Sequence, residues 1–281
     1  MIPAKFDYER VGSVDEAVAL LSAHGDSAKL LAGGHSLLPL MKLRLAVPSL
    51  VIDVGRISEL SYVRDEGDQV AIGALTRHRD LEVSQVLREE VPVLAHIGAQ
   101  IGDPQVRHRG TIGGSIAHGD PASDLPAAVL ALGATLVVEG PEGRREIEVG
   151  EFFVSFLETA IAPDEMLIEI RVPKLRGGWS FQKFNRRAQD WATVGVVAIA
   201  GPPPRVALVN MGLTPLRATA VEEALAVGAS SAQAAELAAE GTEPPSDVNA
   251  SADFRRHLAS VLVRRALEEA RRGNGSRAGA P

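Results

Sequence analysis

Two short segments, each built around a pair of glycines, constrain this chain more than any other feature of its sequence. The first is AGGHSLLP at residues 32–39, the second is TIGGSIAH at residues 111–118, and each lies where a predicted strand ends. A glycine pair permits positive φ angles and removes two Cβ atoms, so consecutive backbone N–H groups can point at one anion. Ser36, Thr111 and Ser115 place hydroxyl groups beside these amides. The segments therefore predict two loops that grip the phosphates of a dinucleotide from opposite sides.

Each glycine pair also has a simpler interpretation, which is a tight turn without a ligand. Neither segment matches the GxGxxG pattern of a Rossmann helix or the GxxxxGK[ST] pattern of a P-loop, so these common nucleotide-binding folds are not supported. Asp124 leaves a second choice open, because it lies near the start of a predicted helix. It can cap that helix, which its residue type alone favours, or accept a hydrogen bond from a ribityl or ribose hydroxyl.

The complete absence of cysteine from the 281 residues excludes several kinds of site. The chain can hold no disulfide, no Cys-ligated zinc, no thiol nucleophile and no iron–sulfur cluster of its own. Its seven histidines show no paired spacing typical of a metal site, so no metal ligand is expected. Any redox chemistry must therefore use a bound organic cofactor or metals carried by a partner.

The charge and hydropathy patterns exclude two further classes of partner. The formal net charge of -7 argues against a nucleic-acid surface, which needs a basic excess. The longest apolar run, residues 125–138, is interrupted by Pro126 and Gly133 and is too short to span a bilayer. Residues 1–10 carry charges and do not resemble a signal peptide. A soluble, cytoplasmic protein is expected.

Predicted strands and helices divide the chain into units. The first, residues 1–55, combines a helix that begins at the capping box SVDE of residues 13–16 with two short buried strands. In the second, residues 56–175, strands alternate with helices, one of them expected over 79–87 and capped by Thr76.

The last part of the chain has a different pattern. Residues 176–272 contain three strand-like runs and then two helices, which is typical of a small α+β domain. Residues 273–281 consist of Gly, Asn, Ala, Arg, Ser and Pro and are predicted to be disordered.

Three parts of the sequence closely resemble the medium, FAD-binding subunits of molybdenum hydroxylases, a family that includes aerobic carbon monoxide dehydrogenase and xanthine dehydrogenase. They are AGGHSLLP, VRHRGTIGGSIAHGDPASDLPA and the pair KFNRRAQDWATVGV with ALVNMGLTPLRA. They occur in the family's order, and the resemblance runs from about residue 1 to 272, nearly the whole chain.

The resemblance implies an α+β fold: a two-subdomain FAD-binding fold of the vanillyl-alcohol-oxidase (PCMH) type plus a small α+β C-terminal domain. FAD would lie between the two subdomains. The resemblance places the pyrophosphate and adenosine side of FAD at the first loop, which comprises Leu30, Leu31, Ala32, Gly33, Gly34, His35, Ser36 and Leu37. From the second subdomain it assigns to the pyrophosphate the loop of Thr111, Ile112, Gly113, Gly114 and Ser115.

The resemblance also assigns residues to the flavin end. It assigns Asp124 to a hydrogen bond with a ribityl or nearby hydroxyl of FAD, whereas its residue type alone favours a capping role. It places Leu167 (or Ile168) and Lys183 near the isoalloxazine, and Ile101 where some relatives have an aromatic ring over the flavin.

Some residues depart from the family pattern or have two interpretations. Ser115 stands where Asn is common, and Thr193 lies where some relatives place an aromatic side chain against the flavin. His35 and His118 raise the idea of a covalent flavin–histidine bond, but the resemblance implies non-covalent FAD. Basic clusters at Arg107 and Arg109 and at Arg186 and Arg187 are interpreted as solvated or carboxylate-paired. Alternatively, these clusters stabilise reduced anionic flavin or contact an acidic surface of a partner.

The resemblance finally implies that three subunits carry out different steps of the reaction. A large partner subunit with a molybdopterin cofactor oxidises the substrate, and a small partner with two [2Fe–2S] clusters passes electrons to FAD on this chain. FAD delivers them to an acceptor such as NAD⁺, a quinone or oxygen. No catalytic side chain is expected here, and the three chains are expected to form a dimer of heterotrimers, a heterohexamer. Two alternatives stay open, a stand-alone FAD oxidoreductase of the same fold and a scaffold subunit that has lost FAD. The substrate is not determined by this chain.

Overall fold

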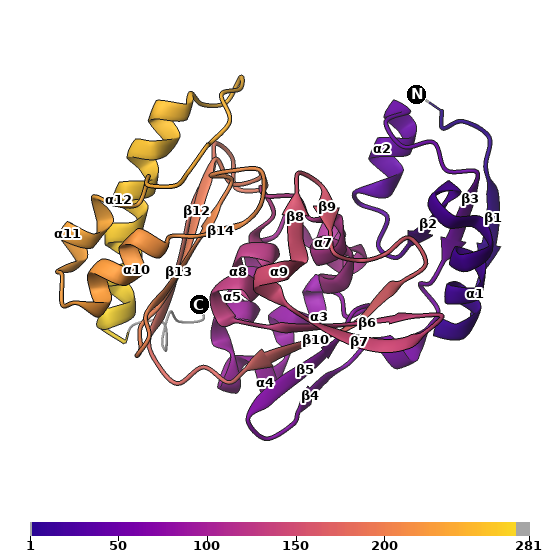
Figure 1. Cartoon of the computed structure of the whole chain (residues 1–281), viewed down its shortest axis with the longest axis horizontal. Helices are drawn as coiled ribbons and strands as arrows, with labels where there is room; N and C mark the ends of the chain where they lie inside the picture. Colours follow the sequence, from indigo (N-terminus) through magenta and orange to yellow (C-terminus); the bar gives the residue numbers. More distant parts are fainter. Residues whose placement is uncertain (1, 274–281) are drawn as a thin grey trace.

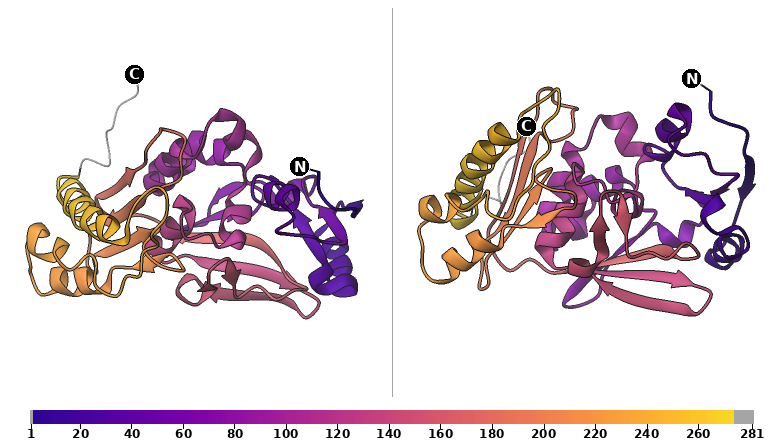
Figure 2. Two further views of the ribbon diagram at one scale, coloured as in Figure 1. Left: turned by 90° about the horizontal axis from the view of Figure 1, so that it is seen from above. Right: turned by 45° about the horizontal axis from the view of Figure 1, so that its top comes forward.

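A computed structural model describes residues 2–273, which fold into three units along the long axis of the molecule (Figure 1 and Figure 2). The predicted disordered tail, 273–281, lies outside the described residues except for Gly273. The first unit contains a parallel three-stranded sheet with the order β1-β3-β2. Its elements are β1 (Asp7–Arg10), α1 (Val14–His24), η1 (Gly25–Ser27), β2 (Ala28–Leu31), α2 (Leu37–Leu43), β3 (Leu50–Asp53) and η2 (Ser58–Leu60).

The second unit, in the middle of the molecule, is an antiparallel sheet covered by short helices. The sheet has the order β4-β5-β10-β6-β7, with β4 (Val63–Asp65), β5 (Gln69–Gly73), β10 (Met166–Pro173), β6 (Thr135–Gly140) and β7 (Gly143–Glu148). The helices are α3 (His78–Val83), α4 (Gln85–Glu90), α5 (Pro92–Gln100), α6 (Pro104–Arg109), α7 (Ile112–His118), α8 (Asp124–Leu132) and α9 (Val149–Phe152). A small hairpin follows, made of β8 (Phe153–Ser155) and β9 (Glu158–Thr159).

The third unit is an antiparallel four-stranded sheet followed by three helices. The strands, in sheet order, are β11 (Trp179–Phe184), β12 (Val194–Ile199), β13 (Arg205–Val209) and β14 (Leu216–Arg217). The helices are α10 (Thr219–Ala226), α11 (Ser231–Ala235) and α12 (Ala252–Arg271). The expected pattern of strands followed by helices is confirmed, and so is the mixed α+β fold class.

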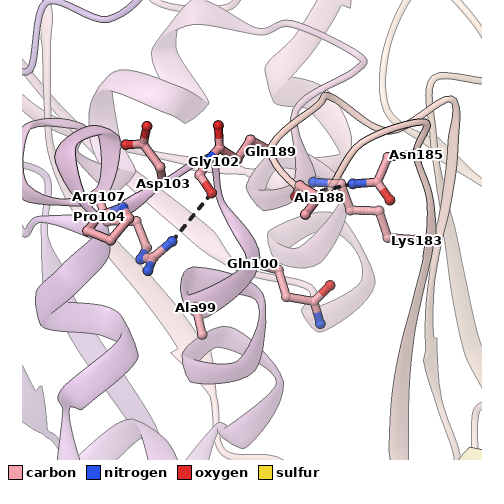
Figure 3. A pocket seen from close by; sticks show the side chains of 10 residues that line it. All are labelled: Ala99, Gln100, Gly102, Asp103, Pro104, Arg107, Lys183, Asn185, Ala188 and Gln189. Carbon is pink, nitrogen blue, oxygen red and sulfur yellow. Dashed lines mark hydrogen bonds between the residues drawn. The ribbon is translucent and has the colours of Figure 1, made fainter.

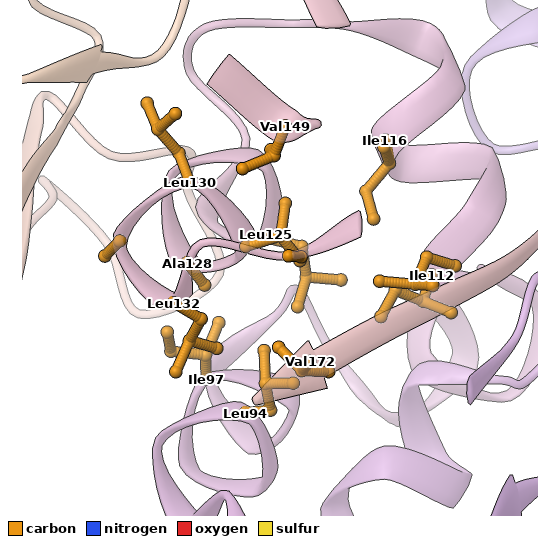
Figure 4. Close-up of a cluster of buried hydrophobic side chains, with 14 of the residues drawn as sticks. Leu94, Ile97, Ile112, Ile116, Leu125, Ala128, Leu130, Leu132, Val149 and Val172 are labelled. Atoms are coloured by element: carbon orange, nitrogen blue, oxygen red, sulfur yellow. The ribbon is translucent and has the colours of Figure 1, made fainter. Parts of the chain in front are cut away.

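Helix α8 is the element on which the second and third units meet. All nine of its residues are buried, because helices of the second unit pack on one side and strands β12 and β13 on the other. Figure 4 shows side chains of α8 together with those of α5 and α7 in the buried hydrophobic cluster. The side chains of strand β12 alternate between two hydrophobic cores. Its residues Val197 and Ile199 join the core around α8, whereas Val194, Val196 and Ala198 join the core under α12. With both faces covered, this strand is apolar throughout.

A third cluster of buried residues attaches the first unit to the central sheet. Ala17 of α1 and Ile52 of β3 belong to the same core as Val137, Met166 and Ile168 from strands β6 and β10. The first unit is therefore held against the second by apolar packing, and this contact sets the distance between the two glycine loops.

Three details differ from the sequence prediction. The helix expected over 79–87 is divided into α3 and α4, because Ser84 has an extended backbone and its hydroxyl caps α4 by accepting from the Leu87 amide at 3.3 Å. Thr76 does not cap a helix, since its hydroxyl is engaged with both backbone groups of Tyr62. Strand β1 was not predicted, because all four of its residues are exposed and carry no apolar alternation.

No helix within residues 2–273 combines the length and the apolar character that crossing a lipid bilayer requires.

Candidate cofactor-binding site

A cavity of about 700 Å³ lies where the first unit, the second unit and the β11–β12 loop meet. Its walls include the two glycine loops and residues from Leu157, in the turn of the β8–β9 hairpin, to Leu167, near the start of β10. It is lined by every predicted FAD-binding residue except Leu31 and Ile112. Ile112 is fully buried in the core of the second unit, so only its neighbours face the cavity.

The first glycine loop follows β2 and presents free backbone donors. Gly34 has a φ of 80°, a left-handed conformation that glycine adopts without strain. No acceptor within the described residues is hydrogen-bonded to the amides of Gly33, Gly34, His35 and Ser36. Four successive donors at the edge of a cavity form a concave site that suits an anion, as the sequence predicted for this loop.

The second glycine loop is built differently, and the prediction of free amides is wrong there. The Ile112 amide donates to Thr76 O at 3.0 Å, and the Gly113 amide donates to Ala74 O at 2.9 Å. The Gly114 amide donates to the hydroxyl of Thr111, which caps α7, at 3.1 Å. These three amides are therefore already hydrogen-bonded within the second unit. The loop still forms part of the cavity wall, through the buried Thr111 and Gly113, the exposed Gly114 and the half-buried Ser115.

The first glycine loop is in direct contact with the residues just before the second loop, and glycine at position 33 is what permits it. A Cβ atom on Gly33 would lie 2.4 Å from Arg109 O and 2.8 Å from the Cα of Gly110. A Cβ atom on Gly113 would lie 2.5 Å from that of Ala74. Since these neighbours are mainly backbone, any side chain at Gly33 would push the two units apart. The first unit therefore packs tightly against the second at the start of the second loop.

Asp124 and Lys183 form a buried ion pair at the opposite end of the cavity. Lys183 Nζ donates to Asp124 Oδ2 at 2.7 Å, and the two side chains are only 7% and 5% exposed. The other oxygen, Oδ1, is buried and has no partner within the part of the chain that the structure describes. Burial raises the pKa of Asp124, while the charge of Lys183 and its hydrogen bond oppose that rise. Asp124 is the first residue of α8, but its carboxylate is used for Lys183 and not as a cap.

The site presents donors for an anion at one end and an unpaired carboxylate oxygen at the other. That oxygen suits a hydroxyl donor. A ligand with a pyrophosphate and a polyhydroxyl chain satisfies both ends, so the residues fit the expected FAD.

The apolar residues of the lining include two that the resemblance assigns to the flavin end. Ile101 follows α5 and is half-buried, and Leu167 lies on β10 and is buried. Thr193 is not part of the lining and is buried, and its carbonyl accepts from Arg255. The aromatic residue at the cavity edge is Trp191, which is 57% exposed. A lone tryptophan in a polar loop was the sequence signal for it.

His78 is a lining residue that the sequence did not reveal. It is buried beside Gly110, where a Cβ atom would lie 2.5 Å from the imidazole Cδ2. Burial lowers the pKa of His78 to about 4, with smaller effects from His35, Arg77 and Arg107. Its Nδ1 has no partner among the residues described. His78 is therefore a neutral ring that supports the contact between the loops.

The remaining histidines and arginines take the simpler interpretations. His35 and His118 line the cavity, and burial lowers the pKa of His118. Arg107 is paired with Glu82 at 3.1 Å and donates to Ile101 O at 3.1 Å. Arg109 and Arg186 are exposed, and Arg187 is exposed and lies 3.7 Å from Asp190. Residues 2–273 contain no group of three His, Asp or Glu side chains arranged to hold a metal ion.

Two family models together cover nearly the whole chain. The model described as "FAD binding domain in molybdopterin dehydrogenase" matches residues 4–175. The model described as "CO dehydrogenase flavoprotein C-terminal domain" matches residues 179–270.

Individual relatives agree with these models. The chain is 43% identical to the carbon monoxide dehydrogenase medium chain of Hydrogenophaga pseudoflava, over 96% of this chain and 98% of that one. It is 38% identical to the alpha subunit of the 6-hydroxypseudooxynicotine dehydrogenase complex of Paenarthrobacter nicotinovorans, over 96% of each chain.

Solved structures resemble the chain over its whole length. A chain of carbon monoxide dehydrogenase from Hydrogenophaga pseudoflava superimposes with a TM-score of 0.93 at 45% identity, covering 97% of this chain and 99% of that one. Quinoline 2-oxidoreductase from Pseudomonas putida 86 gives a TM-score of 0.91 at 31% identity, covering 98% and 99%. The chain therefore belongs to the FAD-binding medium subunits of the molybdenum hydroxylases, the family of carbon monoxide dehydrogenase and xanthine dehydrogenase.

Proposed function

We propose that this subunit holds FAD in the 700 Å³ cavity, receives electrons from a partner [2Fe–2S] subunit and passes them to an external acceptor. The observation that carries the proposal is the pairing of free loop amides at one end with the unpaired Asp124 oxygen at the other. FAD supplies the exchange between one-electron and two-electron transfer, and the protein's task is to bind and orient it. No side chain of this subunit acts as acid, base or nucleophile in substrate oxidation.

Each wall has a proposed role. The amides of Gly33 to Ser36 bind the pyrophosphate, with Leu30, Leu31, Ala32 and Leu37 beside the adenosine side. Thr111 to Ser115, Ile112 included, supports the pyrophosphate from the second unit. Asp124 Oδ1 accepts from a ribityl hydroxyl. The isoalloxazine is surrounded by Ile101, Leu167 and Lys183, and Trp191 lies at its solvent edge. This placement is supported by the fact that all four residues line the same cavity.

The partners and organisation follow from the relatives. Proteins named as medium chains and subunits of dehydrogenase complexes match over their full length. We infer a large molybdopterin subunit, a small [2Fe–2S] subunit, a dimer of heterotrimers and a cytoplasmic location. We also propose that residues 1–55 and 56–175 form the two FAD-binding subdomains and that residues 176–272 form the C-terminal domain. The substrate is chosen on the large partner, because relatives of similar identity are named for different substrates.

The test begins with the full chain and added FAD. Equilibrium dialysis with absorbance spectroscopy should show one bound flavin per chain, and acid precipitation should release all of it, as expected for non-covalent FAD. A chain that binds no FAD would support the scaffold alternative.

The second step separates the subunit from a stand-alone enzyme. Carbon monoxide, aldehydes and N-heterocycles should not bleach the flavin of the isolated chain under anaerobic conditions, whereas the native complex should respond to one of them. Bleaching of the isolated chain at a useful rate would establish a stand-alone oxidoreductase instead.

A further inference from the structure

His78, the first residue of α3, lines the cavity proposed for FAD, and its ring has no hydrogen-bond partner among residues 2–273. The residue is only 5% exposed. Its Nδ1 is sealed from solvent, whereas Nε2 is not, so Nε2 is the nitrogen that faces the open cavity. Buried polar groups in proteins almost always have a partner. A ligand in the cavity can supply the partner that the protein does not.

The chemistry of the neutral ring decides what that ligand can be. Burial lowers the pKa of His78 to about 4, so the ring is uncharged at neutral pH and has a single N–H group. An anion accepts hydrogen bonds and donates none. It therefore binds the ring in the form that carries the proton on Nε2, and it leaves Nδ1 as a buried lone pair. The ring is thus a donor into the cavity.

The backbone of the second glycine loop cannot provide such a donor. The amides of Ile112, Gly113 and Gly114 are already hydrogen-bonded, and the Ser115 amide donates to Thr111 O at 3.0 Å. An anion held by the free amides of the first loop can therefore be contacted by this part of the second unit only through side chains.

His78 lies where the second unit touches the first loop. A Cβ atom on Gly110 would lie 2.5 Å from Cδ2 and 2.6 Å from Nε2 of His78, so the ring packs on Gly110. A Cβ atom on Gly33 would lie 2.8 Å from the Cα of the same Gly110. The charge of His35, in the first loop, also contributes to the lowered pKa of His78. The ring is therefore close to the free amides of that loop.

Two arginines near the ring are engaged elsewhere. Arg107 is paired with Glu82 at 3.1 Å and donates to Gly102 O at 3.5 Å, in the turn that follows α5 (Figure 3). Arg77 donates through Nη1 to the carbonyl of Arg109. Neither Arg77 nor Arg107 lines the cavity. The imidazole is therefore better placed than either guanidinium group to reach an anion inside it.

We propose that His78 is a further FAD-binding residue, which donates a hydrogen bond from Nε2 to the pyrophosphate beside the amides of Gly33 to Ser36. The inference rests on the proposed function, because it needs FAD in this cavity. Hydrogen bonds to ionised acceptors are about twice as strong as those between neutral groups. The bond from His78 also joins the second unit to an anion that the first unit holds, so the pyrophosphate fastens the two units together.

Three variants separate the donor from the packing of the ring. His78→Leu keeps an apolar side chain of comparable size and removes both nitrogens. His78→Gln places an amide N–H near the position of Nε2. His96→Leu is the control, because His96 is half-buried on α5 and does not line the cavity. Urea denaturation of the FAD-free chains first gives the stability of each variant.

Three readouts on the full chain do not depend on turnover. Fluorescence titration gives the dissociation constant of FAD. Proton–nitrogen NMR of protein labelled with ¹⁵N-histidine follows the Nε2–H signal of His78, which is identified by its absence in His78→Leu. Phosphorus NMR at saturating FAD reports the surroundings of the two bound phosphates.

We expect His78→Leu to raise the FAD dissociation constant at least about tenfold, whereas His78→Gln should stay within about threefold of wild type. The stability of FAD-free His78→Leu should not fall, because the change removes a buried nitrogen that has no partner. FAD should shift the Nε2–H signal downfield. The phosphorus signals of bound FAD should differ between wild type and His78→Leu, and His96→Leu should match wild type in binding and in these signals.

Wild-type affinity in His78→Leu would overturn the inference, as would phosphorus and Nε2–H signals that do not respond. Equal weakening of FAD binding in His78→Leu and His78→Gln, with a matching loss of stability, would show that the ring only supports packing. Failure of the wild-type chain to bind FAD contradicts the proposed function itself.

Discussion

Asp124 and Lys183 form a 2.7 Å ion pair that joins the first residue of α8 to strand β11, although 59 positions separate them in the sequence. The pair fastens the C-terminal sheet to the second unit at the FAD cavity. Because both side chains are almost fully buried, each depends on the other for compensation of its charge. The free oxygen Oδ1 is held at the cavity wall by the same bond.

Removal of one partner of this pair should be costly. Asp124→Ala leaves a buried ammonium group without its counterion, and we expect the free energy of unfolding of the FAD-free chain to fall by about 3–5 kcal/mol. The double variant Asp124→Leu with Lys183→Met should cost less than Asp124→Ala, since it leaves no unpaired charge. Urea denaturation measures the free energy of unfolding of both variants. The exposed i,i+4 pair of Arg264 with Glu268 is the control, and Arg264→Ala should cost less than about 0.5 kcal/mol. A double variant that loses as much stability as Asp124→Ala, or more, would contradict this prediction.

His78 should make the protein less stable as the pH falls. Its pKa is lowered from 6.5 to about 4 in the folded chain, so the unfolded chain binds a proton first. The stability associated with the neutral ring is complete above pH 6.5 and is lost progressively as the pH falls toward 4, by about 3 kcal/mol in total.

The variant His78→Gln isolates this effect from the other titrating groups. The difference between its unfolding free energy and that of wild type should change by about 3 kcal/mol between pH 7 and pH 4, when measured in urea. A pH-independent difference for His78→Gln would mean that the ring is not desolvated in solution.

Gly33→Ala should weaken FAD binding by displacing the first glycine loop. The added methyl group would lie 2.4 Å from Arg109 O, which is backbone and cannot move alone. The two loops must separate, and we expect the FAD dissociation constant to rise at least about tenfold. Fluorescence titration with FAD measures it. Gly150→Ala is a matched control, because a Cβ atom there meets nothing within 4 Å and its φ is not positive. Equal affinity of the two variants would show that the loops tolerate separation.

Arg255 should position the loop that carries Trp191. Its guanidinium group is 1% exposed, donates to Thr193 O and pairs with Asp247 at 2.8 Å. Arg255→Met removes both bonds, and we expect a loss of about 2–4 kcal/mol in the free energy of unfolding. The Trp191 emission should also shift in the FAD-free protein as its loop moves. Arg256→Met changes a more exposed arginine on the same helix and should alter neither property. An unshifted emission spectrum in a folded Arg255→Met protein would limit Arg255 to a structural role.

Local residue patterns predicted much of the fold. Ser13 and Glu16 flank the start of α1, Ser13 accepts from the Glu16 amide at 3.2 Å, and the helix spans the predicted positions. The three strand-like runs predicted in residues 176–272 correspond to β11, β12 and β13. These elements were predictable because caps and periodicity act over a few neighbouring residues. Strand β1 was not, since its pairing with β3 depends on backbone contacts and not on its own side chains.

The sequence by itself determined that a chain without cysteine holds no iron–sulfur cluster, and that two glycine pairs each follow a predicted strand. Only the tertiary structure decided which glycine loop offers free donors, because the amides of Ile112 and Gly113 are taken by the carbonyls of Thr76 and Ala74. It also decided that Asp124 faces Lys183. The physical reason is the same in both cases: a polar group's partner is set by which distant segment packs against it, and local spacing does not contain that information.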